Sequence, residues 1–202
     1  APLLLYGIGP LQQLSASGIA IVGSRQPDAG GLEFARRLGG ACAASGLVVF
    51  SGGARGVDEA AAEGALDGGG ATVLVLAGDL GKTALNRTWR TRIRQGMATL
   101  CALGPPEARF SVAAAMGRNR VLYALGRAAV VVASDQGKGG TWEGATENLR
   151  RWQVPLYVRE AHVPTGNQAL IAKGGRPFPA EGLADPSVLV QEAPAVSPGG
   201  EV

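Results

Sequence analysis

The chain has 202 residues, of which 46% are apolar and 5% aromatic, with 32 glycines and a net charge of +3. This length suits one domain with a substantial core, and the composition favours an α/β packing of small side chains over an aromatic-rich β-sandwich. No run approaches the roughly 20 apolar residues of a membrane span, and no charged secretory start is seen. We therefore expect a cytoplasmic protein with no membrane partner.

The cations are almost all arginine, because only three of the 19 basic residues are lysines. Arginine suits phosphate and carboxylate, although a GC-rich genome gives the same bias. The pI of about 9.2 mildly favours a polyanionic partner. The cysteines, Cys42 and Cys101, match no metal spacing and are too few for a disulfide framework. We predict buried thiols in a reducing compartment, no metal site and no cofactor.

In chain order, short apolar runs alternate with helical patterns over about 160 residues. The runs are continuous rather than alternating, which is typical of strands covered on both faces, and the order predicts a doubly wound, mostly parallel α/β sheet of Rossmann-like type. We expect a lead-in over 1–18, this domain over 19–180 and a flexible tail over 181–202. The expected strands are Ile19–Val22, Leu47–Phe50, Thr72–Ala77, Met97–Leu103, Ala128–Ser134 and Val154–Val158. The expected helices are Leu32–Ala44, Val57–Leu66, Leu85–Gly96, Ala114–Leu125 and Trp142–Trp152.

Three loops follow expected strands and precede expected helices, at the edge where ligands bind such sheets: Gly23–Gly31, Ser51–Gly56 and Ser134–Thr141. Their glycines turn the backbone sharply and expose N–H groups, and a helix N-terminus adds positive potential. Three such loops together favour a ligand that carries phosphate. The candidate ligands in them are Gly23, Ser24, Arg25, Ser51, Gly52, Gly53, Arg55, Gly56, Lys138, Gly139, Gly140 and Thr141.

For two cations in these loops, a structural role is an alternative to ligand binding. Arg55 either binds an anion or pairs with Asp58 or Glu59 on the next turn. Lys138 either contacts a phosphate or is a solvated lysine in a glycine turn, and Thr141 can cap the following helix.

The standard nucleotide motifs and catalytic groups are missing. No GxxxxGK[ST] occurs, Gly23–Gly30 does not read GxGxxG, and Phe50 and Ser51 stand where a ribose-binding acid would. The only histidine, His162, is predicted to be a surface residue. No catalytic residue is therefore predicted.

Two further basic segments lie on expected helices. In the first, a helical wheel places an apolar side opposite a basic side, which is either a solvated face over a buried tryptophan or an auxiliary phosphate track. The two sides are Leu85, Trp89, Ile93 and Gly96 against Arg87, Arg90 and Arg94. In the second, Arg118 and Arg120 cannot share a helix face, so one can reach the ligand while the other packs or pairs, and Asn119 suggests a polar role.

The sequence resembles the DNA-processing protein A family (DprA, also called Smf). The motifs "AIVGSR", "SGGARGVDEAAAEGAL", "TVLVLAGDL", "RNRVLYALG" and "GKGGTWEGA" occur in the family's order over about Ile19 to Val158. The second motif is the most specific, because the family has SG-x-ARG-[IV]-D followed by GAL. This chain matches it at Ser51, Gly52, Ala54, Arg55, Gly56, Asp58, Gly64, Ala65 and Leu66.

The resemblance implies an extended Rossmann domain that binds single-stranded DNA without cutting it and loads the RecA recombinase in natural transformation. It also implies that Arg55 and Lys138 contact DNA phosphates, that the glycines beside them shape the pocket, and that the protein forms a homodimer. We extend the phosphate contacts to Arg25 and one arginine of the Gly117–Arg120 segment. Trp89 and Trp142 are candidates for base stacking, although core packing is favoured for both.

The chain also departs from the family pattern, which predicts a divergent, single-domain member. Ala62 replaces a usual histidine, and a Tyr-Pro pair is missing near Lys82 and Thr83. Ala115 and Met116 replace a Phe-Pro pair, which removes a candidate stacking aromatic, and Trp142–Ala145 replaces Leu-Ile-Thr-Ala.

Two alternatives stay open. The chain resembles, more distantly, the lysine-decarboxylase-like phosphoribohydrolases (LOG enzymes), whose PGGxGTxxE motif carries a catalytic glutamate. Glu143 stands one residue short of that spacing, which turns a helical side chain by about 100°. The other alternative is a sensor that holds a single nucleotide.

Overall fold

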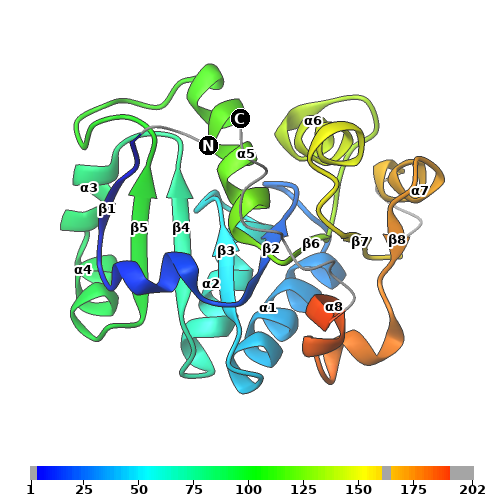
Figure 1. Ribbon diagram of the computed structural model, residues 1–202, viewed down its shortest axis with the longest axis horizontal. Helices are drawn as coiled ribbons and strands as arrows, with labels where there is room; N and C mark the ends of the chain where they lie inside the picture. The colour runs from blue at the N-terminus through cyan, green and yellow to red at the C-terminus, as the bar shows by residue number, and fades with distance from the viewer. Residues whose placement is uncertain (1–3, 161–164, 192–202) are drawn as a thin grey trace, which may run out of the picture.

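The computed structural model describes residues 4–160 and 165–191 as one eight-stranded sheet between two layers of helices (Figure 1). The strand order is β1-β5-β4-β3-β2-β6-β7-β8, and every neighbouring pair is parallel except β1 with β5. The strands are β1 Tyr6–Ile8, β2 Gly18–Val22, β3 Val48–Ser51, β4 Thr72–Leu76, β5 Ala98–Ala102, β6 Ala128–Val131, β7 Leu156–Val158 and β8 Arg176–Pro177. The predicted doubly wound α/β class is confirmed.

The α-helices are α1 Ala29–Ala44, α2 Val57–Asp67, α3 Leu80–Leu85, α4 Arg87–Arg94, α5 Val112–Leu125, α6 Gly139–Glu147, α7 Gly166–Ala172 and α8 Ser187–Gln191. Two 3₁₀ helices, Leu11–Ser15 and Ala180–Leu183, and a π-helical turn, Asn148–Trp152, complete the described elements. The basic segment expected as one helix is two, because Asn86 ends α3 and its side chain accepts hydrogen bonds from Thr88 N and Trp89 N at the start of α4.

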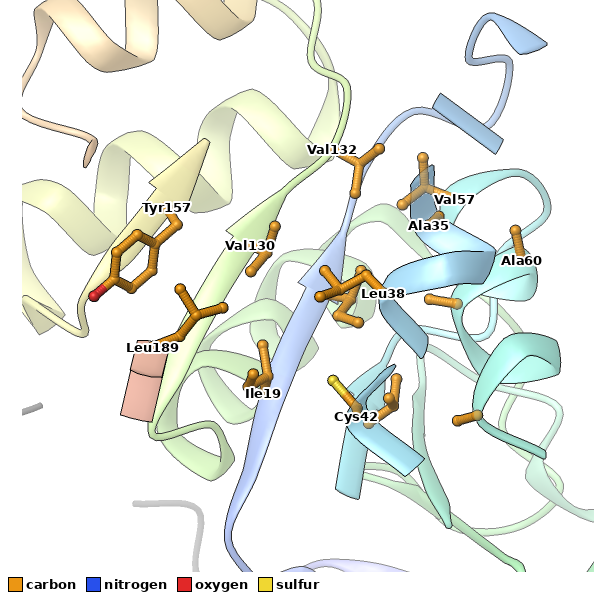
Figure 2. Close-up of a cluster of buried hydrophobic side chains, with 14 of the residues drawn as sticks. Ile19, Ala35, Leu38, Cys42, Val57, Ala60, Val130, Val132, Tyr157 and Leu189 are labelled. Carbon is orange, nitrogen blue, oxygen red and sulfur yellow. The ribbon is translucent and has the colours of Figure 1, made fainter. Parts of the chain in front are cut away.

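Both faces of the central strands are buried. On β2, Ile19 and Ile21 lie in a first core cluster with α1 and α2, while Ala20 and Val22 lie in a second with α5. Figure 2 shows the first cluster, where Leu38 and Cys42 of α1 lie over the sheet near Ile19. Continuous apolar strands fit this burial, because side chains alternate between faces that both need apolar groups.

Small residues allow the helices of one layer to pack closely. A Cβ on Gly39 of α1 would overlap Ala61 O of α2, and a Cβ on Gly64 of α2 would overlap Arg36 O of α1. The two cysteines are buried as predicted, and burial raises the pKa of Cys42 and of Cys101 to about 12. These thiols are therefore protonated and unreactive in the folded protein.

The two end segments differ from expectation. Part of the lead-in forms β1, which adds an antiparallel edge to β5. Part of the segment expected as a flexible tail forms α8, whose Leu189 is fully buried beside β6 in the first core cluster (Figure 2). Residues 192–202, and the predicted surface residue His162, lie outside the described residues.

Candidate nucleic-acid interface

A cavity of about 500 Å³ opens at the carboxyl ends of β2 and β6. Successive strands are added on one side of β2 as far as β5, after which the chain crosses through α5 to β6 on the other side. Strand order reverses at that point, which is where ligands bind in open parallel sheets. The lining residues that carry polar or aromatic groups are Ser24, Arg25, Asp58, Phe110, Arg118, Asn119, Tyr123, Ser134, Asp135, Lys138 and Thr141.

The loop after β3 already contains an anion from the chain itself. The Asp58 carboxylate accepts hydrogen bonds from Gly52 N (3.1 Å) and Ala54 N (3.5 Å). Its Oδ2 also lies 3.7 Å from Nη1 of Arg118, and the two side chains are only 6% and 12% exposed. Gly52 leaves room for this pair, because a Cβ at this position would overlap the Arg118 guanidinium and displace it. The loop therefore binds Asp58 where we expected a phosphate.

Burial controls the ionisation of this inner end of the cavity. Burial raises the pKa of the Asp58 carboxyl, against the stabilising effect of Arg118 and of backbone N–H groups. Burial also lowers the pKa of Arg118, against the attraction of Asp58, but a guanidinium stays charged in proteins. Burial, and then Asp58, raise the pKa of Tyr123, whose phenol is therefore neutral. Arg118 Nε and the Tyr123 hydroxyl have no hydrogen-bond partner among the described residues.

The loop after β6 is open, in contrast. It ends at Lys138, which precedes α6 and makes no side-chain cap, and the first turn of α6 has no acidic residue. Gly139 has φ +85°, and a Cβ on it would meet no atom within 4 Å, while Asn119 Nδ2 donates to Gly140 O (3.0 Å) to fix the helix against α5. The N–H groups of the first helical turn have no partner within a helix. Exposed Lys138 and the start of α6 therefore offer fixed N–H donors and a mobile charge to the cavity.

The loop after β2 adds a second exposed cation. Ser24 N donates to Ala133 O (2.8 Å) beyond β6, and Ser24 O accepts from Val57 N (3.2 Å), so this loop is held between its neighbours. Arg25 points over the ring of Phe110 at 5.8 Å, and both residues line the cavity. The Phe110 ring is half exposed, so it offers an aromatic surface at the entrance.

The predicted site residues divide into two groups. Those that line the cavity are Gly23, Ser24, Arg25, Arg118, Asn119, Lys138, Gly139, Gly140 and Thr141. Those outside the lining are Ser51, Gly52, Gly53, Arg55, Gly56 and Arg120. Arg55 and Arg120 are exposed, and neither has an ion pair among residues 4–160 and 165–191. The alternative pairing of Arg55 with Asp58 or Glu59 is therefore not seen either.

Ser51, Gly56 and the two candidate tryptophans have structural roles. The Ser51 hydroxyl donates to Ile21 O (2.9 Å) between β3 and β2. Gly56 has φ +84°, and a Cβ on it would lie 2.6 Å from Ser24 O, so it permits the close approach of two loops. Trp142 is buried in the second core cluster, the one with α5. Trp89 packs against a third cluster, which contains Leu74, Leu76 and Leu100, so both tryptophans pack in the core.

Sequence reasoning missed Phe110 and Tyr123 as lining residues. Phe110 lies just before α5 and supplies the aromatic that Ala115 and Met116 lack. The sequence held a signal for Phe110, because an aromatic residue between Arg109 and Ser111, the N-cap of α5, lies at the start of a helix next to a cation. Glu143, the residue of the phosphoribohydrolase alternative, is exposed and does not line this cavity. It lines a separate, more open cavity with Arg150, Arg151 and Lys173.

The described part of the chain offers neither a membrane span nor a cluster of metal ligands. Among residues 4–160 and 165–191, no helix has the length and apolar character needed to cross a bilayer. In the same residues, no three His, Cys, Asp or Glu side chains are grouped as metal ligands would be.

Comparison with known proteins identifies the family. The model of the DNA recombination-mediator protein A family matches residues 1–181. The putative DNA processing protein DprA of Mycobacterium tuberculosis is 38% identical over 168 residues, which are 81% of this chain and 41% of the relative. The chain thus spans less than half the length of that relative.

Solved structures of similar fold include two of the same family. DNA processing protein A of Streptococcus pneumoniae has a TM-score of 0.80 and 22% identity, over 96% of this chain and 68% of that one. DNA processing protein A of Helicobacter pylori, solved for insight into its single-stranded DNA binding mode, has a TM-score of 0.74 and 25% identity, over 87% of this chain and 81% of that one. The chain belongs to the DNA recombination-mediator protein A family.

Proposed function

We propose that the cavity binds single-stranded DNA and does no chemistry on it. The observation that carries this proposal is the meeting of Arg25, Lys138 and the uncapped start of α6 in one cavity beside an exposed phenylalanine. Phosphate is suited to fixed N–H donors next to mobile cations. The family and the single-stranded DNA binding of the Helicobacter pylori relative support a nucleic-acid ligand.

The geometry suggests a division of roles. One phosphate would accept hydrogen bonds from the N–H groups of Gly139–Thr141 and pair with Lys138. Arg25 would pair with a neighbouring phosphate, while Phe110 would stack on a base. Such contacts recognise backbone and ring faces rather than base edges, so we expect weak sequence preference and strong salt dependence.

The Asp58–Arg118 pair would shape the pocket rather than bind the backbone directly. The Asp58 carboxylate holds the loop after β3 in place. Because it lies 3.7 Å from the Arg118 guanidinium, the two charges largely cancel at the inner end of the cavity. A phosphate would therefore be attracted to the outer part of the cavity, where Arg25 and Lys138 are exposed.

The test is fluorescence anisotropy of a labelled oligo-dT at two salt concentrations. Replacing Arg25 and Lys138 together by alanine should weaken binding roughly tenfold and reduce the slope of log K against log salt by about 1.4, since each phosphate contact on a single strand contributes about 0.7. The control removes two exposed cations outside the cavity, Arg37→Ala with Lys173→Ala. Equal affinity of the two double variants would contradict the proposal.

The finer family properties are predictions from the resemblance. Homodimer formation is checked by sedimentation of the purified chain. RecA loading is checked by RecA filament assembly on strands coated with a single-strand binding protein.

The phosphoribohydrolase alternative makes a different prediction. The protein would release free base from nucleoside monophosphates, and Glu143→Gln would abolish this release.

A further inference from the structure

We propose that three exposed arginines of α4, Arg87, Arg90 and Arg94, form a second contact surface for the same DNA strand after it leaves the cavity. This inference rests on the proposed single-stranded DNA binding. It concerns a helix that contributes no residue to the cavity lining.

The orientation of α4 is fixed by its apolar side. Trp89 and Ile93 pack against the core cluster that contains Leu74, Leu76 and Leu100, while Arg87, Arg90 and Arg94 are exposed. At about 100° per residue the three arginines fall within about 60° of one another, and at about 1.5 Å per residue they extend over about 10 Å. They therefore form one straight basic row, which we call the α4 row.

The α4 row lies in a locally basic segment. From Leu80 to Gly96 the chain has five basic residues and no acidic one. Arg92, on another face, pairs with Asp67 at 3.7 Å. No ion pair is found for the α4 row among residues 4–160 and 165–191. Like charges three and four residues apart destabilise a helix, so an anion along the row would stabilise it.

The cavity and the α4 row are connected through one loop. The residues between β5 and α5, which include Phe110, rest on the start of α3 (Figure 1). Asp79 N donates to Ala108 O (2.6 Å), and Gly81 N donates to Pro106 O (2.8 Å). A strand that stacks on Phe110 and continues along this loop would reach α3, where Lys82 is exposed, and α4 follows α3 directly in the chain.

The experiment compares two lengths of oligo-dT, about 6 and about 20 nucleotides, chosen to fill the cavity alone or to extend beyond it. The variant replaces the α4 row by glutamine (Arg87→Gln, Arg90→Gln, Arg94→Gln), which keeps helix propensity. We expect affinity for the long oligonucleotide to fall roughly tenfold and its salt slope to fall by about 2, with the short one unchanged within about twofold.

The control removes three exposed arginines elsewhere, Arg37→Gln, Arg127→Gln and Arg150→Gln, for the same change in net charge. Equal weakening by both triple variants, or unchanged long-oligonucleotide affinity in the α4 variant, would overturn this inference while the proposed function stands. If the unmodified protein binds neither length, the proposed function itself fails. Circular dichroism and urea unfolding of each variant verify that the overall helix content and the stability of the fold are unchanged.

Discussion

The loop after β3 and the loop after β6 look alike in sequence, but the first binds a carboxylate of the chain and the second leaves its N–H groups open to a ligand. Both are glycine-rich and join a parallel strand to a helix. In the first, Asp58 returns to accept hydrogen bonds from Gly52 and Ala54 and pairs with Arg118. In the second, no side chain caps α6, and Lys138 stands exposed at its start. A glycine loop therefore predicts an anion, but the anion can belong to the chain.

The composition of the first helical turn distinguishes the two cases. The first turn of α2 contains Asp58 and Glu59, whereas that of α6 contains no acid. An acid in this turn can satisfy the same N–H groups that a phosphate would use. The absence of such an acid, more than the number of glycines, marks the loop that is free for a ligand.

Asp58→Asn should have the largest effect on stability. It leaves the guanidinium of Arg118 buried without a counter-charge, and breaking a buried pair in this way costs about 3–5 kcal/mol. Urea unfolding measures this loss. Asp135→Asn, an exposed acid of the other loop, is the matched control and should change stability by less than about 0.5 kcal/mol. A small effect at position 58 would mean that the pair does not hold the loop.

Alanine substitutions at two glycines test how tightly the backbone is packed after β3 and at the start of α6. Gly52→Ala places a Cβ on the Arg118 guanidinium and should cost about 1–3 kcal/mol. Gly140→Ala meets only Asn119 Nδ2, at 3.9 Å, and should be neutral or stabilise by up to about 1 kcal/mol, since alanine favours a helix. Thermal or urea unfolding gives both values. Similar costs at the two positions would contradict the difference in packing.

The strands, the helices and their order follow from sequence because each central strand is a continuous apolar run between glycine-rich loops. The short elements at the ends do not follow in this way. β1 has three residues and α8 has five, too few to show a period. Their packing depends on distant parts of the chain, because β1 pairs with the edge of β5 and Leu189 of α8 packs into the first core cluster over β6. The break at Asn86 has a local signal, because asparagine is a good N-cap.

Within the site, sequence placed the loops but not their partners. Lys138 and Arg25 are in the cavity because strand ends meet at one edge of a parallel sheet. The pairing of Asp58 with Arg118 joins positions 60 residues apart, so it depends on how α5 crosses the sheet. Phe110 is likewise brought in by a loop that rests on α3. These contacts are properties of the folded chain.

Arg55→Ala gives the smallest expected effect and the sharpest test of the comparison. Arg55 is exposed and outside the cavity lining, so its charge should act at the rim and its loss should weaken oligo-dT binding by less than about threefold. Anisotropy beside the Arg25 and Lys138 double variant measures this difference. A loss as large as that of the double variant would mean that the loop after β3 binds the strand directly. In that case the phosphate would contact Arg55 itself, because the N–H groups of Gly52 and Ala54 already donate to Asp58. The role of Asp58 would then be to hold this loop so that Arg55 faces the strand.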